Sequence, residues 1–193
     1  MSKVNYYGKD MSYADSQVIF DKTASFLRAK LNPFDRIIRI DPVKDKKLQF
    51  AGVDKILVTQ NGKILKVEEK IRKKDWGDIL VELIADNRYA SYDPINDKFN
   101  YSELRGIGWG MKDYSTDLLL YYFEETNSGH LLSWKKFQAV FKAMLNQWYV
   151  YAMKNQHGFS LKIAKNKNYN SINIAIPKDV LLNAYQGVGG KII

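Results

Sequence analysis

The sequence contains no cysteine and only two histidines, His130 and His157. Without cysteine, the chain has no disulfide bond, no thiolate nucleophile and no cysteine-ligated zinc. Two histidines also argue against a metal site built from several imidazoles. No run of about 18 apolar residues occurs, so no transmembrane helix is expected. The N-terminal segment MSKVNYYGKDMSY is polar and lacks the apolar core of a signal peptide, which predicts a soluble cytoplasmic protein.

The composition is typical of one packed domain. The chain has 193 residues, of which 46% are hydrophobic and 13% aromatic, enough to bury a sizeable core. We expect a single domain over residues 1–193, with a flexible arm at 1–11 and a frayed tail at 187–193. The net charge of +9 favours a polyanionic partner, because lysine and arginine that neutralise phosphates release counterions.

Residues 52–72, GVDKILVTQNGKILKVEEKIR, are typical of two antiparallel strands joined by a tight turn. Asn61-Gly62 lies between two apolar, β-branched runs. This dipeptide is the strongest short-range signal of a hairpin, because both residues tolerate positive φ. In a hairpin the start of one strand lies beside the end of the other. We therefore expect Asp54 to approach the segment 68–70, which is Glu-Glu-Lys.

Side chains alternate along a strand, so Glu68 and Lys70 share one face and Glu69 points to the other. An aspartate, a glutamate and a lysine on one patch suit phosphodiester cleavage. The carboxylates hold Mg²⁺, or Mn²⁺, through oxygen, and the lysine orients or helps to deprotonate the attacking water and offsets charge on the phosphate. A bulge would shift the register by one residue, so Glu68 and Glu69 both stay candidate metal ligands beside Asp54.

The spacing of Asp54, Glu68 and Lys70, D-x13-E-x-K, resembles the motif of the PD-(D/E)xK nuclease superfamily, with Val53 in place of the proline. The resemblance covers roughly residues 15–85. It implies a restriction-endonuclease-like core, in which a helix is followed by an antiparallel β-meander, a helix and a further strand. It also implies an Mg²⁺-dependent deoxyribonuclease, with an endonuclease as the expected kind and DNA as its substrate.

The same resemblance suggests further site residues. In this family the first helix often contributes an extra acid to the metal site, and Asp21 is the candidate here, with Asp15 behind it. The backbone carbonyl of Glu69 is a candidate metal ligand. Many such nucleases work as homodimers, so a homodimer is left open, although nothing in the sequence marks a dimer surface. The small chain, rich in lysine and asparagine, is similar in style to phage or mobile-element nucleases.

Basic residues after the hairpin and in a second predicted hairpin near the C terminus are candidates for phosphate contacts. They are Arg72, Lys73, Lys74, Lys162, Lys165 and Lys167. For the last three, a charged strand edge that blocks aggregation is an equal alternative. Arg72 has the alternative of an ion pair with Glu82.

Apolar periodicity along the chain predicts an α/β (α+β) fold, with a central mixed sheet flanked by helices. Helices are expected at residues 13–31, 133–154 and after Pro177. Strands are expected at residues 34–41, 48–60, 63–72, 78–85, 159–164 and 171–176. Residues 117–125 are expected to form a strand or a short helix, and residues 86–112 mostly loop.

Two features of the middle of the chain have competing interpretations. Gly106, Gly108 and Gly110 form a GxGxG run, but the flanking SELR and MKDYSTD provide neither the strand nor the helix that a dinucleotide loop needs. We expect a close-packed turn or a loop against DNA. Glu82 interrupts an apolar strand and needs a partner. That partner is either the metal site or a nearby basic residue, Arg72 or Lys70.

Two other classes of function fit the composition. A non-catalytic nucleic-acid-binding protein explains the charge, the aromatic residues and the basic hairpin. It does not explain why carboxylates group with a lysine. A structural or assembly protein would use its tyrosine-rich strands as a subunit interface. The grouping of Asp54, Glu68 and Lys70 therefore favours a metal-dependent nuclease.

Overall fold

The computed structural model describes residues 17–93, 96 and 98–193, which divide into two compact units. The five-stranded unit comprises residues 17–76, 113–137 and 185–193. The three-stranded unit comprises residues 77–112 and 138–184. The arm expected at residues 1–11 lies outside the described residues, and the single domain stays a prediction.

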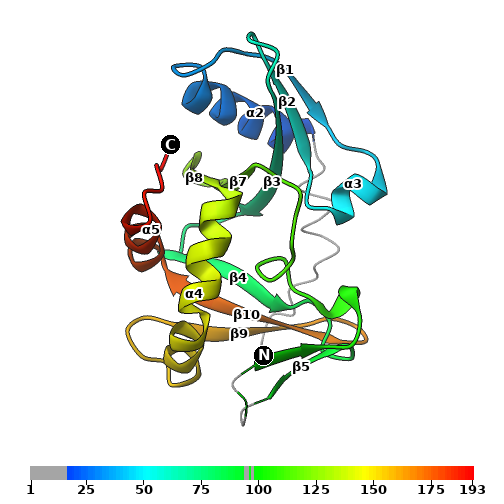
Figure 1. The fold of residues 1–193 in the computed structure, drawn as a ribbon, viewed down its shortest axis with the longest axis vertical. Coiled ribbons are helices and arrows are strands. Elements are labelled where there is room, and N and C mark those ends of the chain that lie inside the picture. The colour runs from blue at the N-terminus through cyan, green and yellow to red at the C-terminus, as the bar shows by residue number, and fades with distance from the viewer. Residues whose placement is uncertain (1–16, 94–95, 97) are drawn as a thin grey trace. The chain divides into compact units, whose positions relative to one another are not determined.

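The five-stranded unit is built on a mixed sheet with the strand order β1-β2-β3-β7-β8 (Figure 1). Its strands are β1 (Ile37–Pro42), β2 (Lys55–Thr59), β3 (Ile64–Arg72), β7 (Leu118–Phe123) and β8 (Ser128–Ser133). β3 and β7 are parallel, and the other neighbours are antiparallel. The predicted mixed sheet flanked by helices is confirmed, and so is the strand at residues 117–125.

Helix α2 (Gln17–Leu31) packs on this sheet through an apolar stripe. Ala24, Leu27 and Leu31 recur at helical spacing and join one buried cluster with Leu57 of β2 and Leu120 of β7. The N-terminal part of the predicted helix, residues 13–16, lies outside the described residues. The order of a helix followed by an antiparallel meander agrees with the sequence prediction.

A short helix, α3 (Lys46–Phe50), stands where the sequence predicts a turn and the start of a strand. Asp45 caps it, since its Oδ1 accepts the N–H groups of Lys47 at 2.7 Å and Leu48 at 3.2 Å. Gly52 then turns the chain at φ 75°. The prediction of a strand from residue 48 is wrong at its N-terminal end, because this cap favours a helical turn over extension.

Three strands and a 3₁₀ turn lie between β3 and β7 among the described residues, in place of the crossover helix that the resemblance implies. They are β4 (Asp78–Ile84), β5 (Ala90–Asp93), β6 (Lys98–Tyr101) and η1 (Leu104–Gly106). The sequence did not predict β5, β6 or β8. All three are short, at four to six residues, and carry little alternation of their own, so their pairing depends on neighbouring strands.

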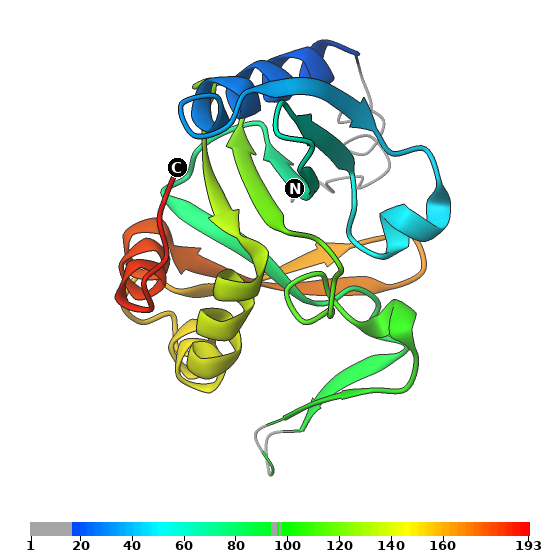
Figure 2. The same ribbon diagram turned by 45° about the horizontal axis from the view of Figure 1, so that its top comes forward.

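The three-stranded unit contains an antiparallel sheet of order β4-β10-β9, with β9 at Ser160–Lys165 and β10 at Asn170–Pro177. The β5–β6 hairpin extends as a two-stranded ribbon (Figure 2). Its aromatic face packs on α4 (Trp134–Met153), with the Tyr92 and Phe99 rings 4.3 and 5.1 Å from the Tyr149 ring. This packing explains why a segment predicted as loop is ordered into strands.

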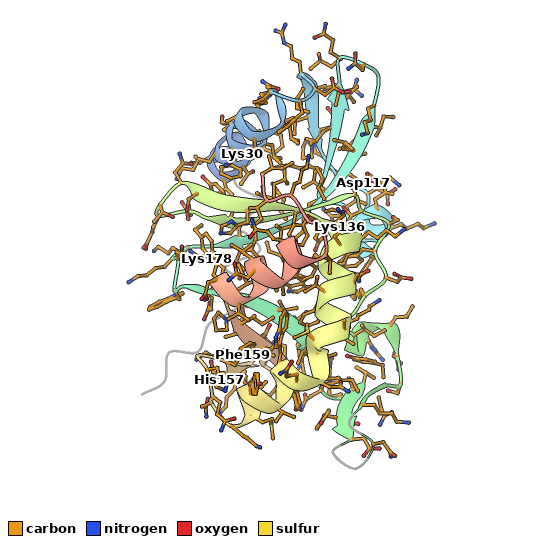
Figure 3. The ribbon with its side chains drawn as sticks, turned by 60° about the vertical axis from the view of Figure 1, so that its left-hand side comes forward. Lys30, Asp117, Lys136, His157, Phe159 and Lys178 are labelled. Atoms are coloured by element: carbon orange, nitrogen blue, oxygen red, sulfur yellow. The ribbon has the colours of Figure 1, made fainter. Side chains whose placement is uncertain are left out.

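The long helix α4 presents the aromatic stripe that the sequence predicts as core. All six residues of the stripe are buried; they are Trp134, Phe137, Phe141, Leu145, Trp148 and Ala152. His157 and Phe159 follow the end of α4 (Figure 3), and both rings pack against Tyr151. Helix α5 (Lys178–Gly187) begins directly after Pro177, as predicted.

The glycine run forms the close-packed turn that the sequence predicts. A Cβ at Gly108 would lie 2.3 Å from the Glu82 carbonyl oxygen, and one at Gly110 would lie 2.2 Å from Val81 Cγ1. The Trp109 N–H lies 3.4 Å from Glu82 Oε2, so the acid in β4 accepts a bond from this turn. Side chains at these glycines would push the turn off β4.

The end of the chain is held to the five-stranded sheet. Ile193 and Leu131 exchange two backbone hydrogen bonds of 3.4 Å, and Ile193 packs against the core cluster. The last residue of the tail is thus ordered, in contrast to the fraying expected from its glycines. None of the helices in the described part of the chain combines the length and apolar character needed to cross a membrane.

Candidate functional site

The β2–β3 hairpin has the register that the sequence predicts. Gly62, with φ 76°, donates its N–H to the Thr59 carbonyl at 3.0 Å and closes the turn. Lys55 then pairs with Val67, without a bulge in the pairing of β2 with β3. Asp54, directly before β2, lies across from the end of β3, where its Oδ2 accepts the Glu69 N–H at 2.8 Å. A local turn has thus brought together residues fifteen positions apart.

Asp54, Glu68 and Lys70 gather on one face of this hairpin, named here the Glu68 face. The Lys70 ammonium donates a hydrogen bond to Glu68 Oε1. The Glu68 side chain is 3% exposed and that of Lys70 is 27% exposed, while Asp54 is half-buried. Glu68 is therefore enclosed, and the Asp54 and Lys70 side chains reach solvent.

Burial and the nearby aspartate shift the pKa values of Glu68 and Lys70 on this face. Burial raises the pKa of Glu68 to about 7, against the opposing effect of Lys70, and Asp54 adds to the rise. For Lys70, burial lowers the pKa, but the charges of Glu68 and Asp54 outweigh it and raise the pKa above its usual range. Glu68 therefore holds a proton up to a pH near 7, and Lys70 stays protonated.

Glu69 lies on the opposite face with a second lysine, and this face is named here the Lys55 face. The Lys55 ammonium donates to Glu69 Oε1 at 2.6 Å and to the Thr23 hydroxyl, and it lies 4.7 Å from the centre of the Phe20 ring. The side chains of Lys55 and Glu69 are only 3% and 11% exposed. Burial raises the pKa of Glu69 despite the lysine beside it. The carboxylate of Glu69 therefore does not share the pocket of Glu68.

The sequence did not indicate that three residues meet beside the hairpin: Lys55, Thr23 and Phe20. A signal existed for Lys55, because the strand alternates and Lys55 shares its inward face with buried Leu57. Nothing local marks Thr23 or Phe20, which reach Lys55 only because α2 packs on this face of the sheet.

Tyr114 borders the Glu68 face from a separate segment of the five-stranded unit. Its ring stands over Gly52, where a Cβ would lie 2.2 Å from the ring, and it packs on Trp134 with ring centres 5.2 Å apart. Tyr114 also contributes to the raised pKa of Lys70, after Glu68 and Asp54. Only glycine at position 52 permits this ring to lie so close to the backbone there.

Asp21 is not brought to the other three residues. It lies on the exposed face of α2, where Gln17 Nε2 donates to its Oδ1 at 2.7 Å. Thr23, two positions on, points to the sheet instead, because successive helical residues are rotated by about 100°. Asp15 lies outside the described residues.

The basic residues predicted to contact phosphates lie in two regions of the structure. Arg72 ends β3 and is half-buried, and Lys73 and Lys74 follow it on the surface, with the Lys74 ammonium 4.6 Å from the centre of the Trp76 ring. In the three-stranded unit, the lysines of the β9–β10 hairpin are all exposed; they are Lys162, Lys165 and Lys167. Both sets are accessible to a polyanion.

The donor set of the Glu68 face fits a hard divalent cation. Asp54 Oδ2 accepts the Glu69 N–H and Glu68 Oε1 accepts the Lys70 ammonium, and the carboxylate oxygens of these two acids are the candidate ligands for a metal. No group of three acidic or histidine ligands forms among the residues that the structure describes. Two carboxylates suit Mg²⁺, which keeps several waters and takes further oxygens from a phosphate.

Comparison of the chain with family models, curated proteins and solved structures finds no match. The chemistry of the Glu68 face therefore carries the functional argument by itself.

Proposed function

We propose that the protein is a metal-dependent nuclease that hydrolyses phosphodiester bonds in DNA at the Glu68 face. The supporting observation is the grouping of Asp54, Glu68 and Lys70 on one face of the β2–β3 hairpin, with Glu68 enclosed and the other two side chains half-buried. The net charge of +9 favours a polyanionic substrate. The restriction-endonuclease-like core, the cytoplasmic location and a homodimer stay predictions.

In this proposal the carboxylates of Asp54 and Glu68 would hold Mg²⁺ or Mn²⁺. When bound, the ion supplies Lewis-acid stabilisation of the scissile phosphate and a more acidic water. Lys70 is fixed by Glu68 and stays protonated, so its part is to orient the attacking water and offset charge on the phosphate, not to remove a proton. The Glu69 N–H holds Asp54 in place, and the Glu69 carbonyl remains a candidate ligand.

The direct test is cleavage of plasmid, single-stranded and four-way-junction DNA by the purified protein, with Mg²⁺, Mn²⁺ or EDTA. We expect cleavage only with a metal, and loss of cleavage in Asp54→Ala and Lys70→Ala. Glu125→Ala and Lys63→Ala are the controls, because each removes an exposed charge of the same sign elsewhere on the surface of the same unit.

The result that overturns the proposal is a wild-type protein that cuts none of these substrates with either metal, or variants that cut as well as wild type. DNA binding that persists in EDTA, without cleavage when metal returns, would favour a non-catalytic binding protein. Affinity for DNA would then fall steeply with salt.

A further inference from the structure

Two turns of the three-stranded unit are held side by side. The Asn87 N–H donates to the Asn170 carbonyl at 3.0 Å, and the Asn170 N–H donates to Asn87 Oδ1 at 2.9 Å. The first turn joins β4 to β5, and the second joins β9 to β10. These reciprocal bonds place Arg88 and Tyr89 beside the lysine-rich turn that contains Tyr169.

Two arginines and two tyrosines form a stacked group at this junction, named here the Arg–Tyr cluster: Arg88, Tyr89, Arg105 and Tyr169. The Arg105 guanidinium lies 3.6 Å from the centre of the Tyr89 ring. The Arg88 guanidinium lies 5.3 Å from the centres of both tyrosine rings. Each guanidinium is thus layered on an aromatic ring, which leaves its planar charge displayed at the surface.

Acidic neighbours fix the two arginines without burying them. Asp86 accepts two bonds from Arg88, 3.0 Å from Nε and 2.6 Å from Nη2, while Glu103 pairs with Arg105 at 2.7 Å. The Arg88 and Arg105 side chains are still 48% and 58% exposed. Both guanidinium groups are therefore oriented in advance and open to a ligand.

A hollow adjoins the cluster. It has a volume of about 360 Å³ and lies along the β5–β6 hairpin. Arg88 and Tyr89 border it together with polar side chains, namely Asn87, Ser91, Asn100 and Ser102. Amides and hydroxyls around a space of this size suit the edges of a single base, and unpaired bases stack on aromatic and guanidinium planes.

We propose that the Arg–Tyr cluster and its hollow bind an unpaired stretch of DNA. A base stacks on the Arg105–Tyr89 layer, and its neighbouring phosphates lie against Arg88, Lys165 and Lys167. Duplex DNA keeps its bases stacked internally and cannot use this platform. The choice of DNA as the ligand rests on the proposed function. Binding at the Arg–Tyr cluster would make DNA with unpaired nucleotides the preferred substrate of the proposed nuclease.

The test measures binding in EDTA, so that no cleavage intervenes. Fluorescence anisotropy compares a labelled oligothymidine with a duplex of equal length. We expect tighter binding of the single strand, and a loss of about tenfold for this strand in Tyr89→Leu and in Arg105→Ala. Tyr89→Phe keeps the ring and should bind as wild type. Glu103→Gln removes the competing carboxylate from Arg105 and should tighten binding.

Lys142→Ala and Phe50→Ala are the controls, because each removes an exposed cation or aromatic ring outside the cluster. Equal affinity of wild type for both DNA forms would overturn the proposal. So would unchanged single-strand binding in Arg105→Ala, whose exposed side chain can be removed without disturbing the core. A protein that cuts DNA but does not prefer single strands refutes only this inference. One that prefers single strands but never cuts refutes only the nuclease.

Discussion

The two faces of the β2–β3 hairpin carry the same pair of residue types in different surroundings. On the Glu68 face, the glutamate is enclosed and Lys70 is 27% exposed. On the Lys55 face, the lysine is 3% exposed and held by Glu69, Thr23 and the Phe20 ring. Asp54 raises the pKa of both glutamates, so the aspartate alone does not distinguish the faces.

The difference lies in what covers each lysine. Helix α2 closes the Lys55 face, so the ammonium there is satisfied within the protein. On the other face Lys70 has a buried carboxylate behind it and solvent ahead, which is the arrangement needed to meet a phosphate. A buried ion pair is weak evidence of stabilisation, but breaking one leaves a charge without a partner.

The largest effect is expected on cleavage. Lys70→Met should lower the rate of DNA cleavage by roughly 10³-fold, because it removes the cation that faces the phosphate. Lys55→Met should retain a rate within about fivefold of wild type, since Lys55 is enclosed behind the sheet. Cleavage of labelled DNA, corrected for folded protein by circular dichroism, makes the comparison. If folded Lys55→Met loses as much activity as Lys70→Met, the catalytic lysine belongs to the other face.

For stability we expect the opposite ranking: substitution of Lys55 should cost more free energy of unfolding than substitution of Lys70. Lys55→Met removes an enclosed ammonium from Glu69, the Thr23 hydroxyl and the Phe20 ring together, and should lower the free energy of unfolding by about 3 kcal/mol. The double variant Lys55→Met/Glu69→Gln should recover most of that loss. Lys70→Met should cost less than about 1 kcal/mol, because Glu68 can keep a proton. Urea unfolding curves give the three values, and equal costs for the two single variants would contradict the contrast.

The raised pKa of Glu68 predicts a pH dependence of stability. Between the usual value of 4.5 and about 7, the folded protein holds a proton on Glu68 that the unfolded chain releases. Stability should therefore fall as pH rises through this window and level off above it. Glu68→Gln lacks this titration and should gain about 3 kcal/mol of stability relative to wild type between pH 4.5 and pH 8, since one pKa unit corresponds to about 1.4 kcal/mol.

Thermal unfolding from pH 5 to pH 8 measures this effect. Asp41→Asn, at an exposed ion pair with Arg39, is the matched control and should follow the wild-type curve. A constant difference between Glu68→Gln and wild type at every pH would show that Glu68 does not titrate in this window.

The smallest effect is stabilisation by metal. Mg²⁺ must displace the proton from Glu68, so its affinity should weaken by about tenfold for each pH unit below the pKa. At concentrations a few times the dissociation constant, the ion should stabilise the fold by on the order of 1 kcal/mol. Differential scanning fluorimetry should show a rise in melting temperature at pH 8, a smaller one at pH 6, and none in Asp54→Ala. A rise that survives in Asp54→Ala would place the ion elsewhere.

Much of the Glu68 face could be predicted because its geometry is local. Asn61-Gly62 specifies a turn, the turn specifies the register, and alternation then places Glu68 with Lys70 and opposite Glu69. The catalytic and metal-binding roles of these residues stay predictions. Asp21 fails to join them because the rotation of α2, set by its apolar stripe, turns Thr23 inward instead.

Contacts between segments distant in sequence were beyond prediction. The short strands β5, β6 and β8 carry weak patterns of their own and are ordered by the neighbours they pair or pack with. The Arg–Tyr cluster depends on two turns about eighty residues apart, joined by Asn87 and Asn170. Local propensity contains no information on such pairings, because their free energy comes from packing and hydrogen bonds across the fold.

By itself the sequence determined the basic charge, the absence of thiol chemistry, the hairpin, and the convergence of an aspartate, a glutamate and a lysine at its open end. These follow from composition and from the conformational limits of neighbouring residues. Tertiary structure decided which lysine is enclosed and which is displayed, and it moved the pKa of Glu68 toward neutrality. Both depend on what lies above each face of the sheet, since burial removes water from a charge and no local pattern records where that happens.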